Sequence, residues 1–355
     1  MKLRSIKELK KKDLEGKRVF VRVDWNVPIV KGKILETHRI DASFPTLEYL
    51  IKNNATLVLA THLGDPKASI EPIVDYVSAK LPEGNLIFLP NLRLNEGEEN
   101  NDKDFAKGLA AEADIYVNDA FAVSHRKHAS IVGLPKLLPA YTGFLLEKEV
   151  TELSKAFKPQ YPFVFVLGGV KFGTKLPLLK KFASLADTIF VGGALANALL
   201  LKEGYEIGKS VVDREVRGLA AILKHKNIIL PVDVVVDGPK GKLVKKPEDV
   251  GKQEKILDIG PESVGLLARE ITKAKFVLWN GPLGNVGIGF KEGTESVAQA
   301  IGKTKAYSII GGGDTVAAIS DLNIENKIDF ISTGGGAMLD FLANGTLLGL
   351  EVLRK

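Results

Sequence analysis

A pattern of strand, turn and helix recurs along the whole chain and constrains its fold more than any other feature. Short apolar runs rich in β-branched residues are each followed by a glycine-rich or polar turn, and then by an amphipathic helical stretch. The first half contains "RVFVRVDWNVP", "ATLVLATHLGDP" and "ADIYVNDAFAVSHR", and the second half contains "FVFVLGGVKFGTKLPLLKKF", "TIFVGGALANALL", "FVLWNGPLGNVG", "YSIIGGGDTVAAI" and "IDFISTGGGAMLDFL". Strands that alternate with helices in this way predict an α/β fold with parallel sheets in both halves.

The length of the chain predicts two domains, because 355 residues are long for a single hydrophobic core. Between the halves lies "LLEKEVTELSKAFKPQYPF", a charged helical pattern that ends in Pro159 and Pro162. This segment is typical of a connecting helix and a hinge. We therefore expect one domain over residues 1–150, a second over 151–340, and a C-terminal segment, 341–355, that returns toward the first.

Composition excludes several classes of function. The chain has no cysteine, which rules out disulfides, thiolate metal sites and a cysteine nucleophile. The net charge of +6 suits anionic ligands, but the lysines are spread along the chain and form no long basic tract typical of nucleic-acid binding. The N-terminus has no apolar signal region, and no apolar run approaches the ~18 residues of a membrane span. We expect a cytoplasmic protein with neither a nucleic-acid nor a membrane partner.

The turns of the two halves carry different residue types. Anion-binding side chains follow the early strands, namely Arg22, Asn26, His62, Arg126 and His128. Glycine follows the late strands, at positions 168–169, 192–193, 311–313 and 334–336. Glycine allows backbone N–H groups to approach phosphate at the start of a helix. Two ligands held in two different ways are therefore expected, both at the carboxyl ends of strands.

The stretch "IIGGGDTVAAI" is the most informative of the glycine turns. A tight turn with Asp314 as the N-cap of a helix would explain part of it. Three consecutive glycines, Gly311, Gly312 and Gly313, cost more backbone entropy than a simple turn requires. A phosphate-binding loop with Thr315 in it and with Asp314 near Mg²⁺ accounts for the whole stretch.

Two further groups of cations fit phosphoryl chemistry. Lys171 and Lys175 follow a glycine strand end and would share one helix face, where they could stabilise a transferring phosphoryl group. In "VRVDWNVP" Arg22, Asp24 and Asn26 alternate with apolar residues and predict a charged strand face. Together with Arg39, His62, Arg126 and His128, that face suits a small ligand that bears carboxylate and phosphate.

The ordered motifs resemble those of the phosphoglycerate kinase family over almost the whole chain. The blocks include "RVFVRVDWNVP", "THLGDPK", "YVNDAFAVSHRKHAS", "VLGGVKFGTKL", "VLWNGPLG", "IIGGGDT" and "ISTGGGAMLDFL". The resemblance implies two Rossmann-like three-layer domains with parallel sheets, joined by a hinge helix. It also implies a monomer whose N-terminal domain binds 3-phosphoglycerate or 1,3-bisphosphoglycerate, whose C-terminal domain binds Mg-ADP or Mg-ATP, and whose hinge closes to bring the ligands together.

The resemblance also implies roles for individual residues. Substrate binding falls to Arg22, Asp24, Asn26, Arg39, His62 and Arg126, with Arg39 reaching the transferring phosphoryl group. Lys171 and Lys175 match the lysines near the nucleotide phosphates, so that Arg39, Lys171 and Lys175 are the expected catalytic residues. The nucleotide would be held by Lys175, Gly192, Gly193, Gly281, Pro282, Gly311, Gly312, Gly313, Asp314 and Thr315, and Mg²⁺ by Asp314.

These residues fit in-line transfer between an acyl phosphate and ADP, in the glycolytic direction that makes ATP. The nucleophile is an oxygen anion in either direction, so positioning and charge stabilisation suffice without a general base. Two alternatives stay open at this point: a kinase of the same fold with altered phospho-acid specificity, and a nucleotide-binding protein with weak turnover. An NAD-dependent oxidoreductase is excluded because no G-x-G-x-x-G with a following acidic residue is present.

Three positions depart from the family pattern. Asp65 stands where the family usually has an arginine after "HLG", and Tyr161 stands where it has one before "PF". Lys67, Lys127 or Lys158 are candidates to replace the missing charge. After "WNGPLG" the chain is one residue shorter than its relatives, and Val286 or Gly287 occupies the position of the glutamate that takes the ribose hydroxyls.

Overall fold

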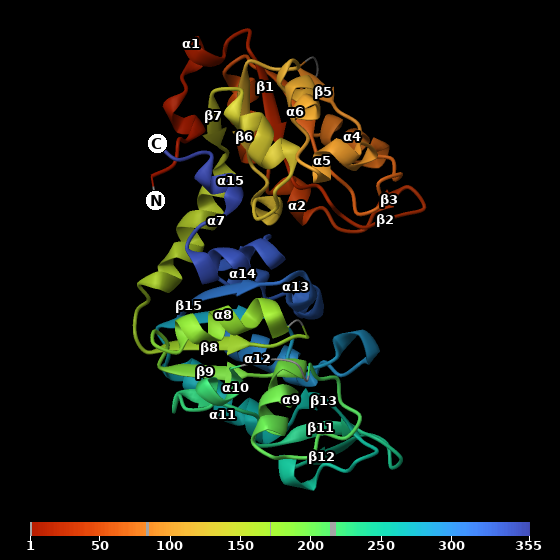
Figure 1. Ribbon diagram of the computed structural model, residues 1–355, viewed down its shortest axis with the longest axis vertical. Coiled ribbons are helices and arrows are strands. Elements are labelled where there is room, and N and C mark those ends of the chain that lie inside the picture. The colour runs from red at the N-terminus through yellow and green to blue at the C-terminus, as the bar shows by residue number, and fades with distance from the viewer. Residues whose placement is uncertain (1, 83–84, 171, 214–217) are drawn as a thin grey trace. The chain divides into compact units, whose positions relative to one another are not determined.

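The computed structural model describes residues 2–82, 85–170, 172–213 and 218–355. The chain divides into two compact units, which are treated separately below. Unit 1 comprises Met1–Thr151 and Asn344–Lys355, and unit 2 comprises Glu152–Ala343. The connecting helix expected between the halves is α7, Phe144–Ser154, which starts in unit 1 and ends in unit 2. Figure 1 shows the elements of each unit.

Unit 1 is built on a five-stranded parallel sheet with the order β5-β4-β1-β6-β7. Its strands are β1 (Arg18–Arg22), β4 (Thr56–Ala60), β5 (Leu86–Phe88), β6 (Ile115–Asn118) and β7 (Ala140–Thr142). Its other helices are α1 (Lys11–Leu14), α2 (His38–Asp41), α3 (Phe44–Lys52), α4 (Glu71–Ser78), α5 (Glu96–Glu99), α6 (Lys103–Ala110) and α15 (Leu348–Glu351). A small hairpin of β2 (Ile29–Val30) and β3 (Lys33–Ile34) completes it.

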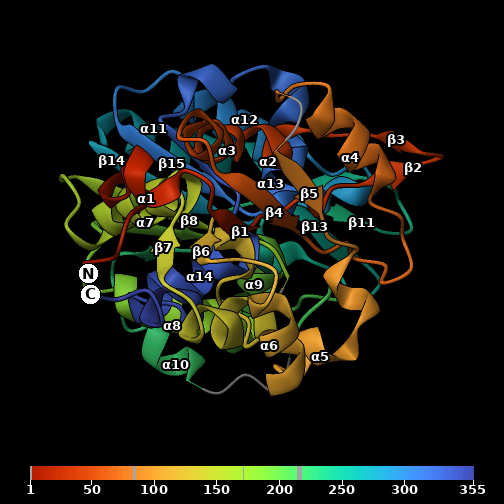
Figure 2. The same ribbon diagram turned by 90° about the horizontal axis from the view of Figure 1, so that it is seen from above.

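Both faces of this sheet are covered, because alternate strand residues point to opposite sides. Val19 and Val21 of β1 belong to the apolar core shared with α3 and α4, whereas Phe20 between them packs in the core on the α6 side. Figure 2 shows α3 and α4 on one side of β1 and β4, with α6 on the other. Leu353, from the C-terminal segment, joins the second of these cores. Unit 1 therefore has three layers.

Unit 2 has a six-stranded parallel sheet with the order β10-β9-β8-β14-β15-β16. The strands are β8 (Phe163–Leu167), β9 (Thr188–Val191), β10 (Ile228–Ile229), β14 (Phe276–Asn280), β15 (Tyr307–Gly311) and β16 (Phe330–Ser332). The helices are α8 (Phe172–Phe182), α9 (Gly193–Lys202), α10 (Leu219–Ile222), α11 (Pro261–Lys273), α12 (Glu292–Ile301), α13 (Gly313–Ile319) and α14 (Gly335–Asn344). A separate antiparallel sheet is formed by β11 (Val234–Asp237), β12 (Leu243–Lys245) and β13 (Lys255–Ile259).

Unit 2 also has three layers. Val164, Val166 and Trp279 point into the core that α11 and α12 cover. The alternate residues Phe163 and Phe165 contact Phe182 of α8 on the opposite face. The predicted α/β fold class with two three-layer parallel domains is therefore confirmed. Within the described part of the chain, no helix is both long enough and apolar enough to cross a bilayer.

Candidate functional site

A cluster of cationic side chains lies beyond the carboxyl ends of the strands in unit 1. We call it the basic cluster, and it consists of Arg22, Arg39, His62, Arg93, Arg126 and His128, with the carboxylates of Asp24, Glu98 and Glu99 between them. Asn26 joins it, because its backbone oxygen accepts a hydrogen bond from Nη1 of Arg39 at 3.4 Å. The cluster therefore brings together the six residues that the sequence predicted for the phosphoglycerate ligand.

Arg22 lies at the bottom of the basic cluster and has no exposed surface. Its Nε donates to Oγ of Ser130 at 2.8 Å, and its Nη2 lies 4.0 Å from Oε1 of Glu98, which is also fully buried. The predicted strand also ends earlier than expected, since β1 stops at Arg22 and residues 23–28 are irregular. Arg22 is thus not on an open charged face, and it can act on a ligand through the residues that it holds.

Asp24 and Arg39 form an ion pair within the basic cluster. Nη1 of Arg39 donates to Oδ2 of Asp24 at 3.1 Å. The second carboxylate oxygen, Oδ1, is buried without a hydrogen-bond partner. A buried acceptor in this state is costly, so it is available to a hydroxyl donor on a ligand. The Arg39 side chain is 26% exposed, and its Nε and Nη2 donate to no other described residue.

His62 is neutral in this arrangement. Burial, followed by the positive charges of Arg22, Arg93, Arg126 and His128, lowers the pKa of His62 from 6.5 to about 2. Its Nδ1 lies 3.3 Å from Nη2 of Arg22. Since an arginine can only donate, Nδ1 accepts this hydrogen bond and the imidazole proton resides on Nε2. His62 can therefore offer an N–H donor to a ligand oxygen without carrying charge.

We expect the stability of unit 1 to fall as the pH falls below about 6.5, in part because of His62. The unfolded chain binds a proton there near pH 6.5, whereas the folded chain does so only near pH 2. The stabilisation is fully present above the unfolded pKa and is lost by about 1.4 kcal/mol for each pH unit below it. Urea unfolding at several pH values should show a shallower loss for His62→Gln than for the wild type. Equal slopes for the two proteins would contradict a neutral His62.

Arg93 belongs to the basic cluster, although the sequence analysis did not select it. Its Nη1 donates to the backbone oxygen of Gly64 at 3.3 Å, and its Nε lies 3.1 Å from Oε1 of Glu99. Burial and the charge of Arg93 lower the pKa of Arg126, whose guanidinium forms no hydrogen bond with another described residue. A signal was present in "LIFLPNLRL", because Arg93 follows a short apolar run just as the predicted anion-binding residues do.

Asp65 and Tyr161, which depart from the family pattern, are both exposed. Oδ1 of Asp65 accepts a hydrogen bond from the backbone N–H of Lys67 at 2.9 Å. Lys67 and Lys127 are exposed as well. Tyr161, which is 51% exposed, and Lys158 are residues of unit 2, whereas the basic cluster is built from residues of unit 1. Arg93 donates to the backbone oxygen of Gly64, the residue directly before Asp65.

In unit 2 the glycine turns come together at the carboxyl ends of β8, β14 and β15. The backbones after β8 and β14 approach so closely that a Cβ at Gly168 would lie 2.6 Å from the oxygen of Gly281. Thr315 connects two of the turns, because its Oγ1 accepts from the N–H of Gly281 at 2.9 Å. Pro282 follows β14, and Gly311, Gly312 and Gly313 lie at the end of β15. Gly192 and Gly193 follow β9, which is the neighbour of β8 in the sheet.

Lys175 is the buried cation of this region, with 6% of its surface exposed. Its Nζ donates to the backbone oxygen of Gly168, and it lies close to Gly169 and Gly281. Lys171, the other predicted catalytic lysine, lies outside the described residues. Lys175 is thus positioned among the glycine turns.

Asp314 is exposed in the first turn of α13, and it forms no hydrogen bond or ion pair with the described residues. No group of three or more acidic or histidine ligands is present in the part of the chain that the structure describes. Mg²⁺ bound with a nucleotide needs no such group, since it takes one or two carboxylates together with phosphate oxygens and water. The donor set at Asp314 therefore fits this ion.

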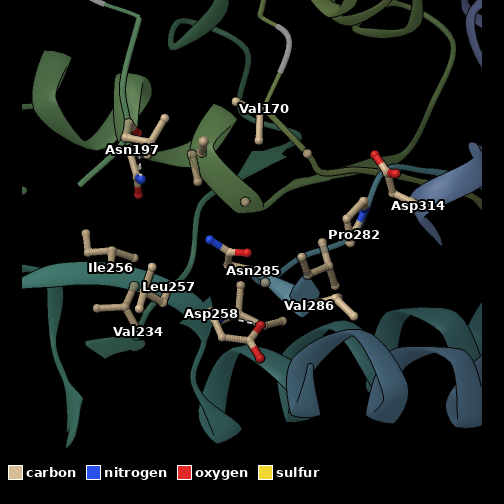
Figure 3. A pocket seen from close by; sticks show the side chains of 18 of the residues that line it. Val170, Asn197, Val234, Ile256, Leu257, Asp258, Pro282, Asn285, Val286 and Asp314 are labelled. Carbon is tan, nitrogen blue, oxygen red and sulfur yellow. Dashed lines mark hydrogen bonds between the residues drawn. The ribbon is translucent and has the colours of Figure 1, made fainter. Parts of the chain in front are cut away.

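A cavity of about 410 Å³ adjoins these turns and is shown in Figure 3. Asp314, Pro282 and Gly193 lie along it, and Val234, Ile256 and Leu257 line the end away from Asp314 in Figure 3. Leu200 and Val211 add further apolar side chains to the lining. Volume and lining are typical of a small-molecule site. Gly287 lines the cavity too. A Cβ atom added to Gly287 would have one described neighbour within 4 Å, Oδ1 of Asn285 at 3.8 Å.

Comparison with known proteins decides the family. The model of a family described as phosphoglycerate kinase matches residues 9–82 and 69–345. The chain is 39% identical to phosphoglycerate kinase of Dictyoglomus turgidum, with 100% of each chain covered, and 40% identical to that of Baumannia cicadellinicola, with 96% of each covered. The chain belongs to the phosphoglycerate kinase family. Family membership confirms the predicted enzyme class, a phosphotransferase with a carboxyl group as acceptor.

Solved structures of phosphoglycerate kinases agree with this result. The phosphoglycerate kinase of Coxiella burnetii has a TM-score of 0.86 at 36% identity and covers 99% of both chains. That of Pyrococcus horikoshii has a TM-score of 0.88 at 31% identity and covers 99% of this chain and 98% of its own. Full-length phosphoglycerate kinase relatives do not favour the alternatives of altered specificity or weak turnover.

Proposed function

We propose that the basic cluster of unit 1 binds 3-phosphoglycerate or 1,3-bisphosphoglycerate and that the cavity of unit 2 binds Mg-ADP or Mg-ATP. The reaction of the family is the reversible transfer of a phosphoryl group between 1,3-bisphosphoglycerate and ADP in glycolysis. The observation that carries the assignment is the basic cluster itself. It joins guanidinium groups with free donors, a neutral histidine donor and an unpartnered carboxylate oxygen, all beyond the ends of one sheet.

Each of these groups matches a part of phosphoglycerate. Arginine forks suit the carboxylate and phosphate groups at its two ends. Oδ1 of Asp24 is a buried acceptor without a partner, which suits the hydroxyl on the middle carbon. His62 offers its Nε2 proton to a ligand oxygen. Arg126 has no competing hydrogen bond among the described residues, so its guanidinium is available to phosphate.

The residues of unit 2 suit the phosphates of the nucleotide. Lys175 and the backbone N–H groups of the glycine turns would hold the phosphate oxygens, and Asp314 would hold Mg²⁺, which spreads the negative charge of the phosphates. When 3-phosphoglycerate is the acceptor, its carboxylate oxygen attacks the γ-phosphorus of ATP and the bond to the ADP oxygen breaks. The nucleophile is already an anion, so Arg39 and Lys175 act through charge and position rather than by moving a proton.

A kinetic experiment with two variants tests which unit binds which ligand. Replacing Arg126 by alanine is expected to raise KM for 3-phosphoglycerate by about tenfold to a hundredfold, because a charged hydrogen bond is lost, and to leave KM for Mg-ATP within about twofold. Asp314→Asn is expected to raise KM for Mg-ATP and to leave KM for 3-phosphoglycerate within about twofold. Asp321→Asn, an exposed carboxylate that follows α13 and lies outside the cavity lining, is the control for Asp314. A rise in KM for Mg-ATP in Arg126→Ala would contradict the assignment.

The oligomeric state, the cellular location and the domain roles stay predictions. We propose a monomer, as the resemblance implies, and a cytoplasmic location. We propose that residues 1–150 bind phosphoglycerate, that residues 151–340 bind the nucleotide, and that residues 341–355 return toward the first domain. The boundaries between the two compact units lie at 151/152 and 343/344. Gel filtration with light scattering would measure the oligomeric state directly.

A further inference from the structure

Asn197 carries an unusual polar atom into the apolar end of the cavity in unit 2. The residue lies in the second turn of α9, and only 2% of its surface is exposed. Its Nδ2 donates to the backbone oxygen of Val211 at 3.0 Å, but its Oδ1 is buried without a hydrogen-bond partner. Figure 3 shows the Asn197 oxygen directed toward the space beside Ile256 and Leu257. Buried side-chain oxygens nearly always have a partner in folded proteins, so this one calls for an explanation.

The neighbours of Asn197 within the cavity offer no such partner. Most of the nearby lining side chains are hydrocarbon, including those of Leu200, Val211 and Ile256. Asn285 lines the cavity as well, but no hydrogen bond joins its side-chain amide to Oδ1 of Asn197. Asp258 also lines the cavity, but its carboxylate accepts from the N–H groups of Ile259 and Gly293, and a carboxylate could not donate to Asn197. Among the described residues of unit 2, Oδ1 of Asn197 is the one buried side-chain nitrogen or oxygen atom that has no hydrogen-bond partner.

The orientation of the amide is determined by the chain. If the amide were turned over, its oxygen would face the oxygen of Val211, and two acceptors would repel each other. Oδ1 is therefore fixed toward the cavity as an acceptor, and a ligand at this end must be flat and apolar on its faces and must bring an N–H donor. An adenine base has this chemistry, because its faces are aromatic and its 6-amino group carries two protons.

We propose that Oδ1 of Asn197 accepts a hydrogen bond from the 6-amino group of adenine, and that this contact makes the enzyme select adenine nucleotides. The inference rests on the proposed function, which places the nucleotide in this cavity. Guanine and hypoxanthine carry a 6-oxo group, which would face Oδ1 with a second acceptor. Purine without a 6-substituent would leave Oδ1 unpaired. Discrimination against such bases comes from the buried group that they fail to satisfy.

The test compares nucleotides that differ only in the base. Steady-state kcat/KM is measured with 3-phosphoglycerate and the Mg complexes of ATP, purine riboside 5′-triphosphate, ITP and GTP. We expect the wild type to favour ATP by about tenfold or more over each of the others, the value of one hydrogen bond to a buried acceptor. In Asn197→Leu, which keeps the volume and removes the acceptor, the ratio of ATP to purine riboside triphosphate should fall to about one.

A matched variant separates this effect from general disturbance. Asn227 also donates Nδ2 to backbone oxygens, those of Ala183 and Ala186, but it is not part of the cavity lining. Asn227→Leu should keep the wild-type ratio. A wild-type ratio near one would overturn the role of Asn197 while leaving the kinase assignment intact, and this holds even if Asn197→Leu does not fold. Failure of the wild type to turn over any of these nucleotides would instead refute the proposed function.

Discussion

Replacing Arg39 by alanine is expected to lower kcat/KM for 3-phosphoglycerate by about a thousandfold or more. Arg39 is held in place through Nη1 by Asp24 and by the backbone of Asn26, while its remaining donors are free. A fixed guanidinium that meets a transferring phosphoryl group stabilises charge that is spread over the oxygens in the transition state. Arginines in this role contribute about 10³–10⁵ to kcat. The effect should therefore appear mainly in kcat rather than in KM.

Two further variants identify the cause of this loss. Arg39→Lys keeps the charge but not the planar fork, so we expect intermediate activity, still well below the wild type. Arg18→Ala is the control. Arg18 lies at the amino end of β1, whereas the basic cluster lies at the carboxyl ends of the strands, and it pairs with Glu112 at 2.9 Å on the surface. Its activity should equal that of the wild type. If Arg39→Ala retained more than about a tenth of the wild-type kcat, Arg39 would not contact the transferring group.

Much of the fold was predictable because its signals are local. Parallel strands buried on both faces require continuous apolar runs, and those runs are visible in β4, β8 and β14 without any structural information. The antiparallel sheet of β11, β12 and β13 was not predicted. Its pairing joins Val234 to Ile259, and no local pattern records such a contact between distant segments.

The candidate site was predictable to the extent that its residues follow strands. Arg93 was missed because β5 spans only Leu86–Phe88, too short a run to be taken as a strand. The burial of Arg22 could not be predicted from the alternation of residues around it. It depends on Ser130, 108 residues further along the chain, and on Glu98, and both approach Arg22 only in the folded unit. Asn197 was overlooked because the sequence of an apolar helix does not show whether the side-chain oxygen of its one asparagine has a hydrogen-bond partner.

The contact between Arg22 and Glu98 gives the largest expected effect on stability. Both side chains are fully buried. Oε2 of Glu98 accepts from the N–H of Ser130 at 2.9 Å, and Oε1 accepts from its Oγ at 2.6 Å. Burial acts to raise the pKa of Glu98, but hydrogen bonding with His128, the charge of Arg22 and the bonds from Ser130 together lower it, so the carboxylate stays charged. Removing either partner would leave an uncompensated charge in the interior.

We therefore expect Glu98→Gln or Arg22→Met to destabilise unit 1 by about 3–5 kcal/mol. Tryptophan fluorescence can follow this unit by itself, because the chain has two tryptophans, Trp25 in unit 1 and Trp279 in unit 2. All variants are made in a Trp279→Phe background, so that Trp25, which is 1% exposed, reports urea unfolding. In this background the midpoint of each single variant should shift strongly downward relative to the parent.

The double variant Arg22→Met/Glu98→Gln decides whether the two charges compensate each other. With both charges removed, no unpaired ion is left in the interior, so its loss of stability should be clearly smaller than the sum of the two single losses. Glu112→Gln provides the contrast. Its ion pair with Arg18 is shorter, at 2.9 Å against 4.0 Å, but its side chain is 46% exposed, and water screens it. We expect that variant to lose less than about 1 kcal/mol. Additive losses at positions 22 and 98 would show that each residue stabilises unit 1 through its own hydrogen bonds and not through the opposite charge.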